Sequence, residues 1–353
     1  MSEDIEKLIR CVVLGIIGII CVAGNALVLR TIFCYKQPRV PIYIIICGLA
    51  IADLVKVCFE IPQYVVSWTK QGQILSETWC KVDIYLVSTC TYVIAYHLVG
   101  LSIVRCILLT DRAHTRTYVL HAILSSVIIW IVMLLANIPA FTTSTKYVID
   151  EENQDCVSSE SDSDKHFWLR TAFSYILPLF VIAAMYVVTH LFSKRFVEES
   201  YSRREIRLSR MVTCLIVVFA ICRLPYEIVS YLLLYKSHQM EDNFEHDASE
   251  DNLFLLYYKV LDYVEVFTLV DLAIRPIIYA KLSWYFSASF DEIINCIPCR
   301  EKSEQRRISR QRRSARMRVD SQPSQTPLTL GVEDYAGVED GPDAIEVVNV
   351  EAG

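Results

Sequence analysis

Seven long apolar runs dominate the sequence, and each is at or above the ~20 residues that an α-helix needs to cross the hydrocarbon core of a bilayer. Of the 353 residues, 54% are hydrophobic and 21% are charged, a balance too apolar for an ordinary soluble chain. The runs are Cys11–Tyr35, Val40–Trp68, Val82–Leu109, Tyr118–Phe141, Phe167–Phe192, Met211–Leu234 and Phe254–Ala280. They predict an all-α fold, a seven-transmembrane helix bundle over residues 11–282.

Lysine and arginine concentrate in alternate loops of this predicted bundle. They follow runs one and three and fill the link between runs five and six, for example at Lys36, Arg112 and Arg203. Because cytoplasmic loops carry the excess of positive charge, we expect a multi-pass plasma-membrane protein with a cytoplasmic C-terminus. Residues 1–10 then form a short extracellular N-terminus. The first run lacks a small-residue cleavage site and predicts a spanning helix, not a signal peptide.

Acidic residues concentrate in the opposite loops. Residues 142–166 hold seven acids and two lysines, and residues 236–252 hold six acids and one lysine. Either these are simply solvated loops, or they form an electronegative funnel that steers a basic extracellular ligand.

Two of the thirteen cysteines stand apart from those inside the apolar runs, which behave as small hydrophobic residues. Cys80 lies at the outer start of the third run, and Cys156 lies in the second outer loop, within the acidic segment 142–166. An oxidising exterior permits a disulfide between them. Such a bond would hold the loop over the mouth of the bundle.

The residues after the last run change character twice. Residues 283–295 place their aromatic and aliphatic side chains along one stripe, which predicts a short amphipathic helix in the membrane interface. Residues 296–353 hold a basic stretch and then an acidic one with few apolar side chains, so we expect a disordered cytoplasmic tail. Cys296 and Cys299 are candidates for palmitoylation, with two unmodified thiols as the alternative.

Polar or kinking residues recur in these runs in an order that resembles the rhodopsin-like (class A) G-protein-coupled receptors. The resemblance covers about residues 10–295, and Cys80 lies twenty-five residues before Arg105, as that family requires. The motifs are Gly24-Asn25-Ala26-Leu27-Val28, Leu49-Ala50-Ile51-Ala52-Asp53, Trp130, Pro178 with Tyr186, Phe219 with Cys222-Arg223-Leu224-Pro225, and Pro276-Ile277-Ile278-Tyr279.

Within that family, the sequence is most similar to chemokine receptors, through Leu224-Pro225-Tyr226 and Glu265, and also resembles galanin-type peptide receptors. Three features depart from the chemokine pattern: a short N-terminus, no glycosylation sequon in it, and no cysteine in residues 236–252. Val87 replaces the aspartate of amine receptors, and the seventh run lacks the lysine that binds retinal in opsins. The resemblance therefore implies a peptide or chemokine-like ligand.

The family's switch at the inner end of the third helix is altered. The family has Asp/Glu-Arg-Tyr, whose acid restrains the arginine in the inactive state, whereas this chain has Val104-Arg105-Cys106. Loss of the acid removes a restraint on the order of 1 kcal/mol, or more where the pair is partly buried, so we expect a less favoured inactive state. Glu205 is either a replacement acid or a solvated one. The resemblance assigns the switch to Val104, Arg105, Cys106, Tyr186, Glu205 and Tyr279.

Two arginines replace neutral family residues inside the bundle: Arg223 replaces a tryptophan and Arg275 an asparagine. An unpaired charge there costs at least about 2.5–3.5 kcal/mol, so both need anions or water. Asp53 and Asp271 resemble residues that bind sodium in many relatives, but the accompanying serine is Ile94 here. We expect an Asp53–Arg275 bridge, no bound sodium and no other cofactor or metal.

Arg223 then has Glu265, Glu227 or Asp271 as possible partners. The buried polar network of Asn25, Asp53, Arg223, Asp271 and Arg275 either only orients helices or biases a two-state equilibrium. Lys56 and Glu60, four residues apart, are expected to pair with each other. The residues that we expect to contact a ligand are Asp83, Glu227, Asp262, Tyr263 and Glu265.

These patterns predict a receptor, not an enzyme, because no catalytic cluster or nucleotide loop is present. The expected partners are a heterotrimeric G protein, a basic peptide or chemokine-like ligand and the lipid bilayer, with no nucleic acid. Ligand-independent signalling is one expectation. The alternative is a non-signalling decoy or scavenger, or a protein that modulates other receptors by hetero-oligomerisation. Arg105 is kept while the acid before it is replaced by Val104, a pattern that resembles virally captured chemokine-type receptors. A viral and a cellular origin both stay open.

Overall fold

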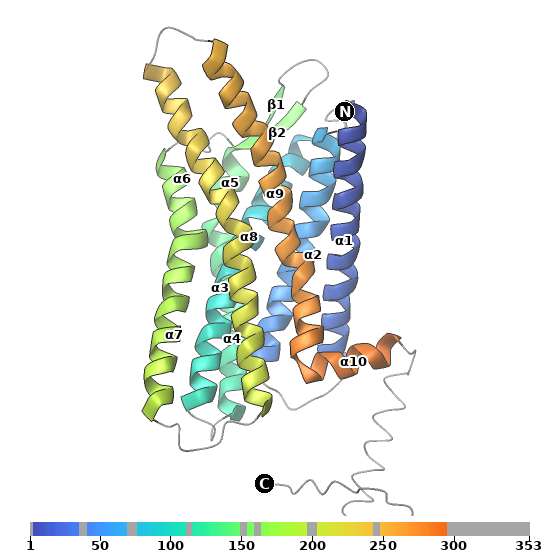
Figure 1. The fold of residues 1–353 in the computed structure, drawn as a ribbon, viewed down its shortest axis with the longest axis vertical. Helices are drawn as coiled ribbons and strands as arrows, with labels where there is room; N and C mark the ends of the chain where they lie inside the picture. Colours follow the sequence, from blue (N-terminus) through green and yellow to red (C-terminus); the bar gives the residue numbers. More distant parts are fainter. Residues whose placement is uncertain are drawn as a thin grey trace, which may run out of the picture. The chain divides into compact units, whose positions relative to one another are not determined.

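The fold is a bundle of long helices, seen in a computed structural model that describes residues 3–34, 41–68, 76–110, 115–148, 154–158, 164–195, 203–242 and 248–294 (Figure 1). All described residues belong to the first of two units, Met1–Cys299, and not to Arg300–Gly353. The helices are α1 Glu3–Cys34, α2 Pro41–Trp68, α3 Glu77–Thr110, α4 Thr115–Ala136, α5 Ile138–Thr143, α6 Asp164–Thr171, α7 Leu177–Arg195, α8 Arg203–Asp242, α9 Ala248–Leu282 and α10 Trp284–Ile294.

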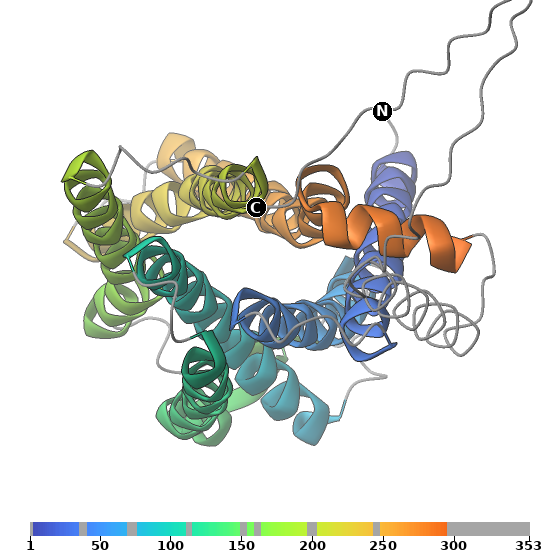
Figure 2. The ribbon, with the colours of Figure 1, turned by 90° about the horizontal axis from the view of Figure 1, so that it is seen from below.

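Seven spans follow from these helices, as the apolar runs predict. Two of the spans are composite: α4 continues into α5 past Asn137, and α6 continues into α7 through a π-helical turn, Ala172–Ile176. Among the described residues, six spans are apolar and long enough to cross a membrane by composition alone. The seventh, α9, carries buried charges such as Asp271 and Arg275 and is recognised by its length and packing. Seen from below, the helices form a ring (Figure 2).

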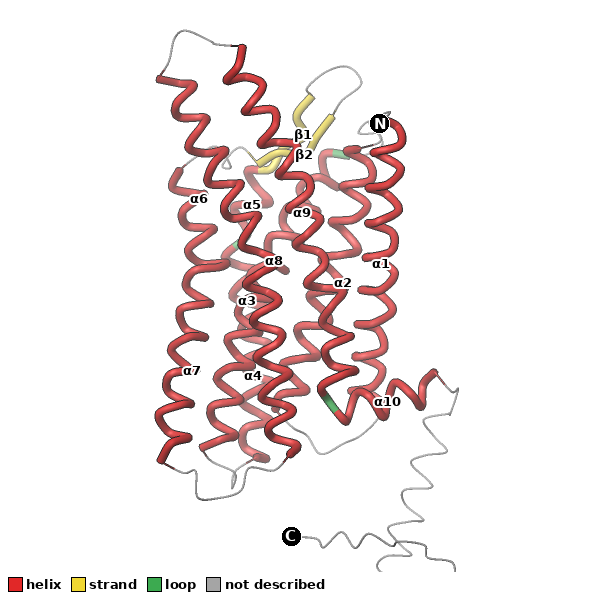
Figure 3. Tube along the Cα trace, in the orientation of Figure 1, coloured by secondary structure: helices red, strands yellow, loops and turns green. Residues whose placement is uncertain are grey.

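The two ends of the bundle differ. At one end, which we call the hairpin end, strands β1 Ser144–Val148 and β2 Gln154–Ser158 pair antiparallel, with Lys146 opposite Cys156 (Figure 3). At the other, the α10 end, α10 runs across the foot of α9 and α1 (Figure 1). Tyr285 of α10 donates a hydrogen bond to the Thr31 carbonyl at 3.1 Å. The β-hairpin is an addition to the predicted all-α architecture.

Several helices extend beyond the apolar runs. The run-based boundaries end the sixth span at Leu234 and begin the seventh at Phe254, whereas α8 reaches Asp242 and α9 begins at Ala248. Much of the acidic segment 236–252 is therefore helical, and the prediction of a loop there was wrong. Residues 3–10, predicted as a separate N-terminus, are the first turns of α1. Polar residues continue a helix readily once its backbone hydrogen bonds are established, so hydropathy alone misplaces such ends.

Close helix contacts depend on small residues. A Cβ atom on Gly24 of α1 would lie 2.6 Å from the Pro276 ring of α9. On Gly48 of α2 it would lie 2.3 Å from His97 Nε2 of α3. His97 in turn donates from Nδ1 to the Val93 carbonyl at 2.8 Å and accepts at Nε2 from the Ser126 hydroxyl at 2.9 Å. These contacts fix α2, α3 and α4 against one another.

Candidate functional site

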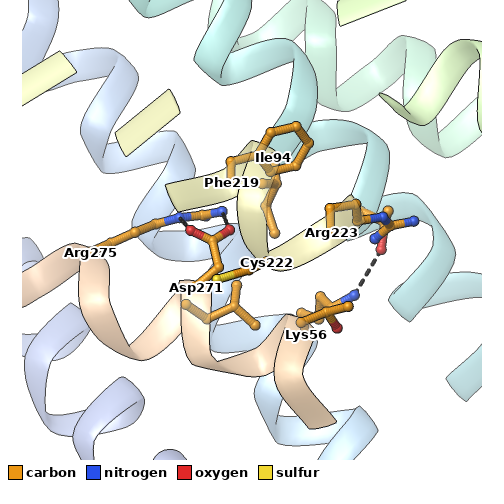
Figure 4. A pocket seen from close by; sticks show the side chains of 10 residues that line it. Lys56, Ile94, Phe219, Cys222, Arg223, Asp271 and Arg275 are labelled. Atoms are coloured by element: carbon orange, nitrogen blue, oxygen red, sulfur yellow. Dashed lines mark hydrogen bonds and ion pairs between the residues drawn. The ribbon is translucent and has the colours of Figure 1, made fainter. Parts of the chain in front are cut away.

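Arg275 is fully buried in α9 and is held by two carboxylates. Its Nη1 donates to Asp53 Oδ1 of α2 at 2.5 Å, and its Nε donates to Asp271 Oδ1, one turn earlier in α9, at 3.1 Å. Nη2 also pairs with Asp271 Oδ2 (Figure 4). The planar guanidinium suits this forked arrangement because it presents several donors in one plane. The expected Asp53–Arg275 bridge is thus present, with Asp271 as a second anion.

The backbone beside Arg275 is opened by Pro276. Proline has no N–H, so the carbonyl of Leu272, four residues earlier, loses its helical donor. Asn25 of α1 supplies one, because its Nδ2 lies 3.5 Å from that carbonyl and 3.0 Å from the Cys21 carbonyl. Asn25 therefore belongs to the same network by stabilising the interrupted turn, not by pairing with a charge.

A small cavity borders this network. Its volume is about 20 Å³, and Arg275 and Asp271 line it together with Lys56, Arg223 and Ile94 (Figure 4). A polar cavity needs roughly 10–15 Å³ to hold one water molecule. The cavity thus has room for about one water between three basic side chains and one acid.

Arg223 of α8 pairs within its own helix. Its Nε donates to Glu227 Oε1 at 3.1 Å, and Glu227 Oε2 accepts a hydrogen bond from the Thr171 hydroxyl at 2.8 Å. Of the three possible partners for Arg223, the structure selects Glu227. Glu227 was also predicted as a ligand contact, yet its side chain is only 6% exposed and both oxygens are engaged within the bundle.

Lys56 and Glu60 of α2 pair with each other as expected. Lys56 Nζ lies 3.4 Å from Glu60 Oε2 and donates to the Thr91 hydroxyl of α3 at 2.9 Å. Both charged side chains are nearly buried. Lys56 also lines the cavity beside Arg275, so it belongs both to that cavity and to the Glu60 pair.

At the α10 end, Arg105 of α3 stacks on Tyr186 of α7. The guanidinium carbon lies 4.4 Å from the ring centroid, within the usual range of a cation–π contact. Arg105 Nε is buried without a hydrogen-bond partner, and no ion pair to Arg105 is found among the described residues. The side chain of Glu205 lies outside the part that the structure describes.

The remaining switch residues line the same region. Val104 packs on the core, Cys106 is buried, and the Tyr186 hydroxyl hydrogen-bonds Thr213 of α8. Tyr279 of α9 is fully buried, and its ring centroid lies 5.4 Å from that of Phe286 in α10.

Two residues predicted to contact a ligand also connect α9 to α1. Asp262 Oδ2 lies 3.3 Å from Arg10 Nη1, and the Tyr263 hydroxyl donates to Glu6 Oε1 at 2.6 Å. The Arg10 guanidinium also lies over the Tyr263 ring, 4.2 Å from its centroid. Sequence reasoning missed this cluster because it treated residues 1–10 as a separate segment. The spacing of Glu6 and Arg10, one helical turn apart, is the signal that could have indicated it.

Cys80 at the start of α3 is buried and disulfide-bonded. Strand β2, which contains Cys156, lies against α3, but the side chain of Cys156 is outside the described residues. The Cys80–Cys156 pairing therefore stays a prediction, as do Cys296 and Cys299 in the undescribed tail.

The sequence profile of the family described as "7 transmembrane receptor (rhodopsin family)" matches residues 24–279. The chain belongs to this family. The matched region begins at Gly24 and ends at Tyr279, so it contains the Arg275 network and the contact of Arg105 with Tyr186. Membership identifies the chain as a multi-pass membrane receptor and not as a member of an enzyme family.

Three relatives resemble the chain over most of its length. An allatostatin-A receptor from Bombyx mori is 27% identical, covering 84% of this chain and 83% of the relative. A galanin receptor 2b from Danio rerio is 24% identical, over 82% and 76%. A C-X-C chemokine receptor type 1 from Oryctolagus cuniculus is 22% identical, over 82% and 80%. All three are animal proteins, and they do not distinguish a viral from a cellular origin of this chain.

Proposed function

We propose that the chain is a plasma-membrane receptor for a basic peptide or chemokine-like ligand and that it signals through heterotrimeric G proteins even without ligand. Family membership supports G-protein coupling, and the names of the relatives support a peptide or chemokine-like ligand. The acidic residues of segments 142–166 and 236–252 support a basic ligand. The N-terminus of the chain would lie outside the cell, and its C-terminus would lie in the cytoplasm.

The contact that supports ligand-independent signalling is that of Arg105 with Tyr186. Val104 supplies no carboxylate, and Arg105 stacks on the Tyr186 ring of α7 instead of pairing with an acid among the described residues. A cation–π contact contributes about 0.5–2 kcal/mol, whereas separating an arginine from a buried carboxylate costs about 3–5 kcal/mol. The arginine is therefore available to a G protein at little cost.

Basal G-protein activation in cells tests this proposal. The measurement compares the unmodified receptor with Val104→Asp and Arg105→Ala at equal surface expression, with no ligand added. We expect a basal signal that Val104→Asp reduces and Arg105→Ala abolishes. If no G-protein class responds above empty cells, ligand-independent signalling is refuted. The decoy, scavenger or hetero-oligomer function is then favoured, consistent with the altered residues Val104, Arg223 and Arg275.

The sodium site of the family is replaced, on our proposal, by the Arg275 guanidinium. Support comes from the pairing of Arg275 with both Asp53 and Asp271, which leaves neither carboxylate without a cation. Exchanging sodium for choline at constant ionic strength should leave the thermal unfolding midpoint of the purified receptor unchanged. A sodium-specific rise in that midpoint would contradict the replacement.

A further inference from the structure

Tyr186 of α7 contacts two other helices at once. Its ring faces the Arg105 guanidinium of α3, whose carbon lies 4.4 Å from the ring centroid, and its hydroxyl hydrogen-bonds the Thr213 hydroxyl of α8. Thr213 lies outside the motifs that carry the resemblance to the receptor family. One tyrosine side chain thus joins α3, α7 and α8 at the α10 end of the bundle.

The direction of the hydrogen bond between Tyr186 and Thr213 is set by a third residue. A threonine hydroxyl has one proton, and Thr213 donates it to the Ser209 carbonyl, one turn earlier in α8, at 3.0 Å. Tyr186 is therefore the donor and Thr213 the acceptor. Because a tyrosine side chain has few torsions, fixing its hydroxyl also fixes the ring face on which Arg105 stacks.

The part of α8 that contains Thr213 lies between a backbone interruption and the α10 end. Pro225 has no N–H, so it interrupts the backbone hydrogen bonds of α8 toward the hairpin end. Nearby, the Tyr175 hydroxyl donates to the Ala220 carbonyl of α8 at 2.9 Å. From there to the α10 end, α8 packs chiefly along α9 and lies less closely against α7 (Figure 2). The Thr213 hydrogen bond therefore ties this segment of α8 to α7.

Arg105 is enclosed by the same helices. Its side chain is only partly exposed, and its Nε is buried. α8 approaches α3 here, and its Met211 and Leu215 are fully buried in the core. A protein that binds the Arg105 guanidinium from the α10 end therefore needs α8 to move away from α3 and α7. The hydrogen bond between Tyr186 and Thr213 opposes that movement.

We propose that Thr213 is a positioning residue of the switch, which acts through Tyr186. By accepting the Tyr186 hydroxyl, it holds the ring against Arg105 and the α10-end segment of α8 against α7. This restraint on the resting state remains although Val104 replaces the acid. A net hydrogen bond shifts an equilibrium about 2- to 10-fold, less than a buried ion pair does, so part of the receptor population stays active. The role of Thr213 rests on the proposed function as a signalling receptor.

The test measures basal G-protein activation without ligand, at equal surface expression, for Thr213→Val, Tyr186→Phe and the double variant. Valine keeps the shape of threonine but accepts no hydrogen bond, and phenylalanine keeps the ring face for Arg105 but donates none. Each single variant should raise the basal signal about 2- to 10-fold. The double variant should add nothing further, because both substitutions remove the same hydrogen bond. Thr213→Ser keeps a hydroxyl and should keep the unmodified signal.

A matched control is a threonine whose hydroxyl stays within its own helix. Thr189 of α7 donates to the Met185 carbonyl at 2.7 Å, so Thr189→Val should leave the basal signal unchanged. An unchanged or lower signal in Thr213→Val would overturn the proposal. So would effects of Thr213→Val and Tyr186→Phe that multiply in the double variant, or a Thr213→Ser variant that behaves like Thr213→Val.

A distance measurement without G protein separates the role of Thr213 from signalling itself. Nitroxide labels on Leu120→Cys of α4 and Arg210→Cys of α8, both exposed positions toward the α10 end, report the position of α8 in the purified receptor by pulsed electron paramagnetic resonance. Thr213→Val should add a population with a longer separation, and Thr213→Ser should not. A longer separation in a receptor that activates no G protein refutes only the signalling proposal. A distance distribution that Thr213→Val leaves unchanged overturns the positioning role, whatever the basal signal.

Discussion

The Asp53–Arg275 ion pair makes a quantitative prediction about stability. Both side chains are 0% exposed, and their atoms approach to 2.5 Å. Removing one partner of a buried pair costs about 3–5 kcal/mol because the other charge stays buried. Asp271 still neutralises Arg275 in Asp53→Asn, so we expect the lower end, about 3 kcal/mol. Arg275→Asn leaves two carboxylates without a cation and should cost about 5 kcal/mol.

A double-mutant cycle measures the coupling between the two residues. The free energy of unfolding of the purified receptor is determined for Asp53→Asn, Arg275→Asn and the double variant. The double variant should be more stable than the sum of the single losses predicts, by about 1–3 kcal/mol, because it contains one fewer unneutralised carboxylate than Arg275→Asn. Losses that add to within about 0.5 kcal/mol would refute the bridge.

A matched control uses a buried carboxylate outside the network. Asp83 makes no contact with Arg275, so Asp83→Asn combined with Arg275→Asn should give additive changes in the free energy of unfolding. Coupling of similar size in this control would indicate a general effect of removing buried charge and not a specific pair.

Two further predictions concern α8 and α2. Glu227→Gln should lower the free energy of unfolding by about 2–3 kcal/mol, measured in the same assay, because Arg223 loses the carboxylate to which it donates. Gly48→Ala should lower it by about 1–3 kcal/mol, because the added Cβ would meet His97 Nε2 and the Ser126 hydroxyl. Gly15→Ala is its control: no atom lies within 4 Å of that Cβ, so a gain of about 0.5–1 kcal/mol is expected.

The sequence predicts the fold well because spanning helices need long apolar runs, and each of the seven runs corresponds to a span. The same criterion fails at helix ends, since hydropathy records the bilayer and not the helix. It therefore misses the observed start of α1, which is Glu3, and the observed end of α8, which is Asp242. The hairpin of β1 and β2 carries no strong alternation of apolar and polar residues that would indicate strands.

The ion-pair partners of charged side chains inside the bundle can be predicted for a related reason. A buried arginine requires an anion, and Asp53 is available to Arg275, so the sequence narrows the choice of partner to a few residues. Near the hairpin end, water can substitute for a partner, and the constraint is weak. The contacts of Asp262 with Arg10, and of Glu227 with Thr171, depend on which helix faces are opposed, and no single-helix pattern contains that information.

The residues that depart from the family pattern, Val104, Arg223 and Arg275, have different effects at the two ends of the bundle. In its middle and hairpin half, Arg275 ties α9 to α2 and Glu227 ties α8 to Thr171 of α6, with buried charges in both contacts. At the α10 end, Arg105 is held by an aromatic face, a weaker contact than an ion pair with a carboxylate would be in that environment. Under the proposed function, strong restraints are thus kept on the side where a ligand would act, and the acid beside Arg105 is missing on the side where a G protein would bind. Such a distribution would resist changes on the ligand side and would cost a G protein little to engage, which is the energetic condition for the ligand-independent signalling that we propose.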